Sequence, residues 1–572
     1  MEYSQTKSLA ACAQVDSTQH AVSDFKRPIA NFRPCIWGHL FLKYDSESME
    51  IDDNMMQQVQ MQKEEVKKLL LSSRNDMAQI LNLIDSLQRL GISYQFEHEI
   101  DEALEQIHNN FSDNKEMTSE EGDLHFLALV FRLLRQKGHH MSSDIFEKFK
   151  NPKGNFNEKI SKDIQGMWRL YEAAHLMIHG EDILDEALDF TYSKLNTLET
   201  NQVSPFLATQ VRHCLKTPLY KRVPRVEIRC YISSYGEESS QSKVLLNFAK
   251  LDYNMLQKMH QKEIGSITKW WKKSDFVTKV PYARDRVVEA YFWPLAMSYV
   301  PKDSIARKIV AKLISVISLV DDTYDAYGTV EELELFTQAI QRWDISLIQS
   351  LPECMQVVFN TIVEFYDEME RTIVEIGKSS LVLPYIKQDF YKVARAYLVE
   401  AKWCKAGYIP TYDEYKVNGL ASTSIPNLIL TFLVFGELSN EELVNWILNY
   451  PTIIDAVSIF GRLTDDISTN KFEHERVHVA SAVDCCMKQY DISQEEAYKL
   501  ILKEIEDLWR VMNEECLKLH HIPRPVLECI LNFARGTHFI YEDFEDKYTN
   551  PDLLKDYIAA LLVDPISIEQ CE

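Results

Sequence analysis

Two acidic clusters, each directly after an apolar stretch, are the residues best suited to chemistry in this 572-residue chain. The first is Asp321-Asp322-Thr-Tyr-Asp325, which ends the apolar run KIVAKLISVISLV. Asp321 and Asp325 are four residues apart and therefore share one face of a helix. Carboxylates are costly to bury unless a positive group compensates them. Two hard oxygen donors on one face suit Mg²⁺, which takes phosphate oxygens and waters as its other ligands.

The second cluster follows the apolar run WILNYPTIIDAVSIFG. Asp465, Thr469 and Glu473 are spaced four residues apart, so they drift only about 80° around a helix. A carboxylate, a hydroxyl and a second carboxylate on one stripe predict another metal site built from oxygen ligands. Arg462 lies one turn earlier on the same stripe, where its guanidinium suits bidentate contact with phosphate oxygens.

Two further arginines, Arg284 and Arg286, stand in the segment PYARDRVVEAYFW. Each could instead form a surface pair with Asp285 or Glu289. Taken with the acidic clusters, they reconcile a formal net charge of −24 with an anionic substrate. The acidic clusters would hold cations, and the cations and arginines together would hold a diphosphate.

The chemistry that fits this arrangement is Lewis-acid assistance to a diphosphate leaving group. An allylic diphosphate that loses pyrophosphate leaves a carbocation, which needs a dry pocket lined by aromatic faces. The chain has 9 Trp, 27 Tyr and 26 Phe. Trp293 and Tyr541 are candidates for such faces, although most aromatic residues must belong to the core.

Helical periodicity of apolar residues recurs along almost the whole chain, and no alternation predicts a sheet. The 16 glycines are at least 12 residues apart, which excludes the G-x-G-x-x-G, Walker A and G-x-S-x-G motifs. We expect an all-α protein with two helical domains. A polar break at residues 233–243 places the boundary, giving domains 1–240 and 241–572.

The acidic balance, 62 Lys+Arg against 86 Asp+Glu, argues against nucleic acid and anionic membrane as partners. The longest apolar-dominated run, Ile309 to Val320, is too short to span a bilayer. Eleven cysteines without a C-x-x-C indicate reduced thiols, and the N-terminus lacks the features of a signal or transit peptide. We expect a cytoplasmic monomer.

The segments DDTYD, LTDDISTNKFE and RDR resemble the aspartate-rich motif, the second metal motif and the lid arginines of plant class I terpene synthases. The resemblance implies a C-terminal class I helical bundle and an N-terminal barrel-like relic domain. It implies three Mg²⁺ ions, with Mn²⁺ as a substitute, held by Asp321, Asp325, Asp465, Thr469 and Glu473. Arg284, Arg286 and Arg462 would contact the diphosphate, Trp293, Tyr541 and Asp546 would line the pocket, and Ser422-Thr423-Ser424 would form the broken-helix segment that steers the cation. Of these, Asp321, Asp325, Arg284, Arg462, Tyr541 and Asp546 are the expected catalytic residues.

The start of the chain narrows the subfamily. Arg27-Pro28, followed after eight residues by Trp37, is similar to the R-P-x8-W signature of the cytosolic sesquiterpene synthases of flowering plants. That resemblance implies farnesyl diphosphate as substrate and a cyclised sesquiterpene and diphosphate as products, with geranyl or geranylgeranyl diphosphate as the alternative. The N-terminal half has no D-x-D-D acid motif for cyclisation initiated by protonation.

Three other interpretations compete. His474-Glu475-Arg476-Val477-His478 matches the H-E-x-x-H of zinc proteases, with Glu495 or Glu496 as a third ligand. A chain-elongating prenyltransferase also ionises allylic diphosphates with Mg²⁺, but it would carry two D-D-x-x-D motifs. A helical-repeat scaffold would show a repeat period, and none is found.

Overall fold

A computed structural model describes residues 32–45, 53–112, 123–199, 203–238, 241–473 and 479–568. Throughout these ranges the ordered elements are helices, and the only β-type pairing is an isolated bridge between Lys150 and Phe156. The prediction of an all-α protein is confirmed.

The helices fall into an N-terminal and a C-terminal set. The first comprises α1 (Asp53–Ser73), α2 (Met77–Arg89), α3 (Glu97–Ser112), α4 (Leu124–Gln136), α5 (Ile164–Ala174), α6 (Asp182–Leu195), α7 (Pro205–Lys216) and α8 (Pro224–Gly236). The second comprises α9 (Lys243–Ser274), α10 (Phe276–Lys279), α11 (Val287–Met297), α12 (Ser304–Ala326), α13 (Val330–Arg342), α14 (Glu353–Glu375), α15 (Leu383–Ala406), α16 (Tyr412–Ser422), α17 (Ile425–Phe435), α18 (Glu441–Leu448), α19 (Thr452–Glu473), α20 (Ala482–Tyr490), α21 (Gln494–Lys518), α22 (Arg524–Ile540) and α23 (Pro551–Leu562).

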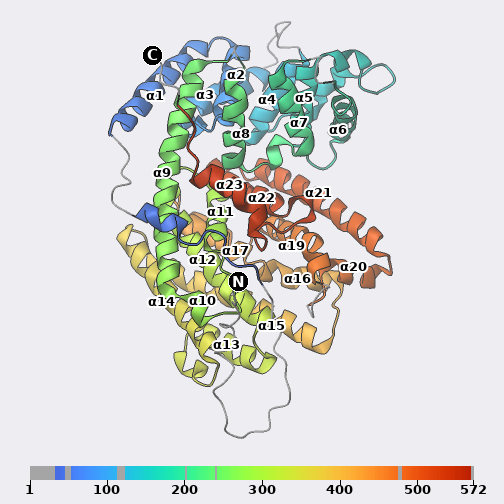
Figure 1. The fold of residues 1–572 in the computed structure, drawn as a ribbon. Coiled ribbons are helices and arrows are strands. Elements are labelled where there is room, and N and C mark those ends of the chain that lie inside the picture. The colour runs from blue at the N-terminus through green and yellow to red at the C-terminus, as the bar shows by residue number, and fades with distance from the viewer. Residues whose placement is uncertain are drawn as a thin grey trace, which may run out of the picture.

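The two sets form an upper and a lower lobe, and the long helix α9 runs along one edge of both (Figure 1). Its 32 residues give it a length of about 48 Å. Below, α9 packs against α11 and α12, and above, it packs against α1 and α8. The predicted domain division at residues 240 and 241 falls between α8 and α9, and it stays a prediction.

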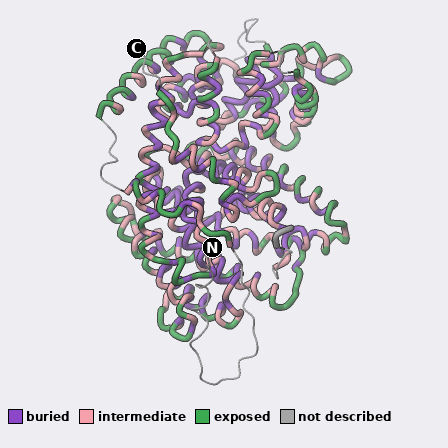
Figure 2. The backbone as a smooth tube through the Cα atoms, viewed as in Figure 1, coloured by how far each residue is buried: buried purple, intermediate pink, exposed green. Residues whose placement is uncertain are grey.

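The helices pack around apolar side chains that form a continuous buried core through both lobes (Figure 2). Helix α12 is the central element of the lower lobe, because it is buried on most sides from Ala306 to Ala326. It contacts α11, α14, α15 and α17. The first acidic cluster is therefore carried by a helix whose position is determined by packing along nearly its whole length.

The first described segment, residues 32–45, packs against the lower lobe rather than against the helices that follow it in the chain. Its 3₁₀-helix η1 (Leu40–Asp45) lies on α9 at Gly265, where a Cβ would come within 2.8 Å of the backbone of Tyr44 and Asp45. Trp37, 8% exposed, donates a 2.8 Å hydrogen bond from Nε1 to Glu289 Oε1 on α11. Arg27 and Pro28 lie outside the described residues.

Helices α16 and α17 would form one rod but for a break at Thr423 and Ser424. Ser424 adopts a left-handed backbone conformation with φ of 59°, which turns the chain before α17 begins at Ile425. The stretch Tyr412–Phe435 has the length and apolarity of a membrane span, but 72% of its apolar window is buried inside the protein. A core helix passes the same test.

Candidate functional site

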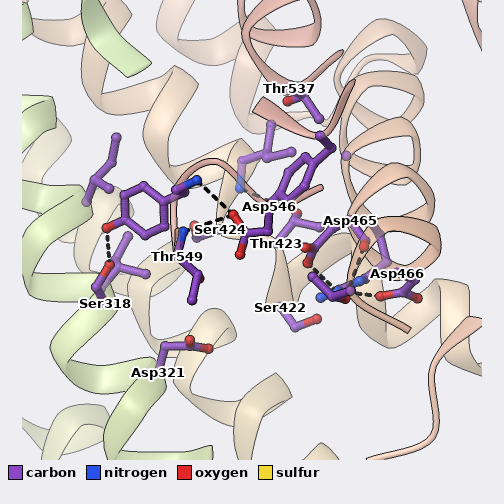
Figure 3. A pocket seen from close by; sticks show the side chains of 18 of the residues that line it. Ser318, Asp321, Ser422, Thr423, Ser424, Asp465, Asp466, Thr537, Asp546 and Thr549 are labelled. Atoms are coloured by element: carbon purple, nitrogen blue, oxygen red, sulfur yellow. Dashed lines mark hydrogen bonds and ion pairs between the residues drawn. The ribbon is translucent and has the colours of Figure 1, made fainter. Parts of the chain in front are cut away.

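A cavity of about 240 Å³ opens in the lower lobe between α12 and α19 (Figure 3). Asp321 lies on one side of it, and Asp465 and Asp466 lie on the other. Nine of the eleven predicted site residues line this cavity. They are Asp321, Asp325, Arg284, Arg462, Asp465, Thr469, Trp293, Tyr541 and Asp546.

On the α12 side, the two adjacent aspartates differ in their surroundings. Asp322 is fully buried and accepts hydrogen bonds from the backbone N–H of Arg284 (2.8 Å) and from its Nε (2.9 Å). The side chain of Asp321 is 28% exposed and faces the cavity, where it accepts a 2.6 Å bond from Arg284 Nη2. Asp325, one turn further along α12, lines the same cavity. Asp322 therefore positions Arg284, whereas Asp321 and Asp325 face the space in which a ligand would lie.

The carboxylates on α12 are held close together at an energetic cost. Burial, and then the neighbouring charge of Asp325, raise the pKa of Asp321 to about 7, although Arg284 opposes the change. Burial alone would lower the pKa of Arg284, but Asp322 and Asp321 raise it well above its ordinary value. The guanidinium thus stays charged, while the carboxylates lack enough positive charge to offset their burial.

On the α19 side, the two adjacent aspartates differ in their surroundings in the same way. Asp466, 1% exposed, forms an ion pair with Arg462 and accepts a 2.8 Å hydrogen bond from the backbone N–H of Ala482. Asp465 is 26% exposed, lines the cavity and also pairs with Arg462. Thr469 lies one turn further and donates its hydroxyl to the Asp465 carbonyl at 3.0 Å. Each wall therefore carries an arginine held by one buried carboxylate and a second carboxylate that faces the cavity.

The two aromatic candidates line the same cavity from different elements. Trp293 on α11 stacks on Phe533 of α22, with ring centroids 5.2 Å apart. Burial, and then the nearby Asp465 carboxylate, raise the pKa of Tyr541 well above its usual range, so this side chain is a neutral phenol. The Trp293 ring therefore adds an apolar surface to the cavity, whereas the Tyr541 ring lies beside the carboxylate of Asp465.

Asp546 shapes the loop that closes one side of the cavity. Its Oδ1 accepts hydrogen bonds from the backbone N–H groups of Tyr548 (2.8 Å) and Thr549 (3.0 Å). The resulting turn brings the Thr549 hydroxyl within 3.3 Å of Arg284 Nη1. Asp546 therefore connects this loop to the arginine on the α12 wall.

The remaining two predicted residues are Arg286 and Glu473. Arg286 is 2% exposed and does not line it; its Nη2 donates to the backbone carbonyls of Arg33 (2.7 Å) and Thr549 (3.0 Å). Glu473 is the last residue of α19, and its side chain lies outside the described residues. Arg286 thus ties the N-terminal segment to the loop after Asp546, and its expected contact with substrate stays a prediction.

The H-E-x-x-H segment at residues 474–478 also lies outside the described residues. Its proposed third ligands have other partners. The Glu496 carboxylate accepts hydrogen bonds from the backbone N–H and the hydroxyl of Ser493 in the capping box of α21, and Glu495 pairs with Lys499 at 2.7 Å.

Glu400 on α15 also lines the cavity, although it belongs to neither acidic motif. It is 8% exposed, lines the cavity and accepts a 3.0 Å hydrogen bond from Asn418 Nδ2. Burial raises its pKa to about 7, with Arg462 opposing the change. The sequence held a usable signal, because Glu400 falls in phase with Val393, Ala396 and Tyr397 on the buried stripe of its helix.

The predicted break at Ser422-Thr423-Ser424 is present, and all three residues line the cavity. Two glycines let α19 approach the break closely. A Cβ on Gly461 would lie 2.5 Å from Ile425 Cδ1, and a Cβ on Gly419 would lie 3.0 Å from Arg462 Cγ. The residues of α19 and the break are thus packed with almost no spare space.

The cavity residues fit a divalent cation such as Mg²⁺. The side chains of α12 and α19 that face the cavity and could bind a metal offer only hard oxygen ligands. The raised pKa of Asp321 indicates that positive charge is in deficit there. Among the described residues, no three His, Cys, Asp or Glu side chains converge as a complete metal centre.

Two family models match the chain. The terpene synthase family metal binding domain matches residues 272–511, and the terpene synthase N-terminal domain matches residues 36–215. Among curated relatives, probable terpene synthase 2 of Ricinus communis is 47% identical over 551 residues, covering 95% of this chain and 99% of the relative. The (−)-germacrene D synthase of Vitis vinifera is 46% identical over 544 residues, covering 95% and 96%.

Solved structures of similar proteins have the same fold. Limonene synthase with 2-fluorolinalyl diphosphate aligns with a TM-score of 0.86 at 32% identity, covering 95% of this chain and 100% of that one. Isoprene synthase from grey poplar, in complex with three Mg²⁺ ions and dimethylallyl-S-thiolodiphosphate, aligns with a TM-score of 0.83 at 33% identity, covering 90% and 98%.

Proposed function

The chain belongs to the terpene synthase family and is a lyase, and from this premise we propose that it converts farnesyl diphosphate to a sesquiterpene. The observation that carries the proposal is the pair of matched walls. Each presents an arginine and a partly exposed carboxylate to one cavity, which aromatic and aliphatic side chains also line. Support for a fifteen-carbon substrate comes from the R-P-x8-W start and from relatives named sesquiterpene synthases at 42–43% identity.

We propose that Asp321 and Asp325 on one wall, and Asp465, Thr469 and Glu473 on the other, hold Mg²⁺, with Mn²⁺ as a substitute. Bound there, the metal would supply Lewis-acid assistance to the departing diphosphate. The isoprene synthase complex with three Mg²⁺ ions supports this assignment. The metal would also supply the positive charge that the buried carboxylates of α12 lack.

The arginines would bind the diphosphate from both walls. Arg462 keeps one buried donor, Nε, without a hydrogen-bond partner in the structure. Arg284 is fixed through its backbone N–H and its Nε by Asp322, which leaves its orientation independent of any ligand. A guanidinium that is already oriented loses little entropy when it binds phosphate, so both arginines favour release of the leaving group.

The apolar part of the cavity lining would hold the hydrocarbon chain after ionisation. The faces of Trp293 and Tyr541 stabilise positive charge through their quadrupoles, and burial keeps water away from the cation. Carbonyl groups at the end of α16, where Ser424 interrupts the helix, add partial negative charge beside the aromatic faces.

Location and assembly extend the same proposal. We propose that the protein acts in the cytoplasm as a monomer, with a small-molecule diphosphate as its partner rather than nucleic acid or membrane. The acidic net charge of −24 supports the exclusion of polyanionic partners.

Incubation of the purified protein with geranyl, farnesyl or geranylgeranyl diphosphate and Mg²⁺, followed by mass spectrometry of the volatile products, tests the proposal. Farnesyl diphosphate should give the highest kcat/KM and fifteen-carbon hydrocarbons or alcohols. Turnover of only the ten- or twenty-carbon substrate would assign a different terpene synthase activity. Condensation of an added five-carbon diphosphate would instead indicate a chain-elongating prenyltransferase.

A further inference from the structure

A second cavity, of about 340 Å³, lies between the two lobes. The upper lobe contributes residues of α2, α3, α4 and α8, and the lower lobe contributes the chain after α11 and residues of α22. Its lining is strongly charged, with seven arginine and lysine side chains against five carboxylates. None of these residues lines the cavity between α12 and α19.

Behind the upper-lobe wall of this cavity lies a buried cluster of five charged residues. Asp85 pairs with Arg89 (2.9 Å), Arg169 (2.5 Å) and Arg132, and Glu172 pairs with Arg89. All five residues are at most 6% exposed. Three guanidinium groups therefore face two carboxylates in a region from which water is largely excluded.

The surplus positive charge of this cluster is only partly compensated. An aromatic ring compensates part of this charge, because the indole of Trp168 lies under the guanidinium groups of Arg89 and Arg169 at 4.9 and 4.1 Å. Burial, and then the neighbouring charge of Arg89, nevertheless lower the pKa of Arg132 to about 10, although Asp85 opposes the change. An uncompensated buried charge destabilises a fold, so a counter-ion would be stabilising here.

The unpaired donors point to the place where a counter-ion would bind. Arg89 Nη1 and Arg132 Nε are buried without a hydrogen-bond partner, and both residues line the cavity. On the same lining, Arg222 pairs with Glu227 through Nη1 at 2.7 Å but has no partner for Nη2, and Arg524 has none for Nε. Residues of both lobes that carry unpaired N–H groups thus line one cavity of about 340 Å³, which is wide enough for a polyatomic anion.

We propose that the cavity between the lobes binds a small phosphate-type oxyanion, held by Arg89, Arg132 and Arg222 of the upper lobe and Arg524 of the lower lobe. The tetrahedral oxygens of such an anion accept several N–H donors at once, as guanidinium groups require. Because the ligand contacts both lobes, its binding stabilises their packing. The site is separate from the proposed reaction and needs no divalent metal.

Isothermal titration calorimetry with inorganic phosphate and with inorganic diphosphate tests this site. The full-length protein is titrated at constant ionic strength with a chelator present, which removes the metal contribution to the other cavity. One saturable site per chain is expected for at least one of the two anions. Binding of both assigns the phosphate group itself as the ligand, and binding of diphosphate alone assigns the longer anion, which the proposed reaction releases.

Matched variants locate the site. Arg222→Gln should weaken binding by at least about tenfold, since a charge-assisted contact is lost. Arg510→Gln removes the same charge from another contact between the lobes, the 2.7 Å pair with Asp185, and should bind as the wild type does. Arg462→Ala should also bind normally. Absence of saturable binding, or binding that is lost in Arg462→Ala and retained in Arg222→Gln, overturns the proposal.

Hydrogen–deuterium exchange of the wild-type protein gives a result that does not depend on a variant folding. Added phosphate should slow amide exchange in α2, α4 and α22, whose residues line the cavity. Slower exchange confined to α12 and α19 would place the anion in the other cavity and refute the inference.

Discussion

Gly461→Ala should change the product mixture while leaving the protein folded. Gly461 lies within α19 directly before Arg462, and a Cβ there would stand 2.5 Å from Ile425 Cδ1 and 3.9 Å from its Cγ1. Carbon atoms pack at about 3.5–4.0 Å, so only the terminal methyl group overlaps, by about 1 Å or more. Ile425 follows the helix break and lines the cavity, so its methyl group must move within the space that holds the substrate.

The two energetic effects on stability nearly cancel. Replacing glycine by alanine inside a helix is favourable by about 1 kcal/mol, and an off-rotamer isoleucine costs about 0.5–1.5 kcal/mol. The melting temperature should therefore stay within a few degrees of the wild type. A change of only about 1.4 kcal/mol in the relative activation free energies of two competing carbocation reactions changes the product ratio tenfold. The displaced methyl group is therefore large enough to alter that ratio.

The assay is the product profile from farnesyl diphosphate, measured with a melting curve for each variant. Ile425→Val removes the overlapping Cδ1, so the profile of Gly461→Ala/Ile425→Val should match that of Ile425→Val alone. Gly236→Ala is the control, because a Cβ there meets Leu246 at an ordinary 3.4 Å. Unchanged products in Gly461→Ala, or equal effects of Ile425→Val in both backgrounds, would refute the reasoning.

Three further predictions concern the charged end of the cavity and its surroundings. Asp325→Asn should lower single-turnover diphosphate release by orders of magnitude. Its melting temperature should stay unchanged or rise slightly, because repulsion near Asp321 is relieved. Excess Mg²⁺ should partly restore release in Asp325→Asn but not in Arg462→Ala, and undiminished release in Asp325→Asn would make Asp325 structural. The wild type should lose stability as pH rises from about 4.5 to 8, because a pKa of about 7 in the folded state makes ionisation of Glu400 unfavourable there. Glu400→Gln should reduce this loss. Melting temperatures that change with pH in the same way in the variant and the wild type would contradict this. Replacing His474 and His478 together by alanine should leave the product profile recognisable. Stoichiometric zinc in the wild type that is lost together with activity in this variant would favour a zinc enzyme.

Much of the site follows from spacing, because a helix converts sequence separation directly into direction. The pairs Asp321 with Asp325 and Asp465 with Thr469 face one cavity, as a period of 3.6 residues requires. Periodicity also predicts the all-α fold, and the resemblance predicts the break after Ser422. A sequence does not show which of two neighbouring arginines turns toward a cavity: in the structure Arg284 lines it and Arg286 does not.

What the sequence by itself determines here is local: helices, their acidic ends, and which side chains share a face. Only the tertiary structure decides the division of work within each aspartate pair. Asp322 and Asp466 are buried against Arg284 and Arg462, while the residue before each faces the cavity.

The position of Glu400 and the surplus charge between the lobes are likewise decided by tertiary packing. Glu400 meets the cavity because α15 packs beside α12 and α16, and the cluster around Asp85 forms from helices far apart in the chain. The physical reason is that the cost of a buried charge depends on the groups around it in space, and those groups are brought together by packing rather than by sequence order.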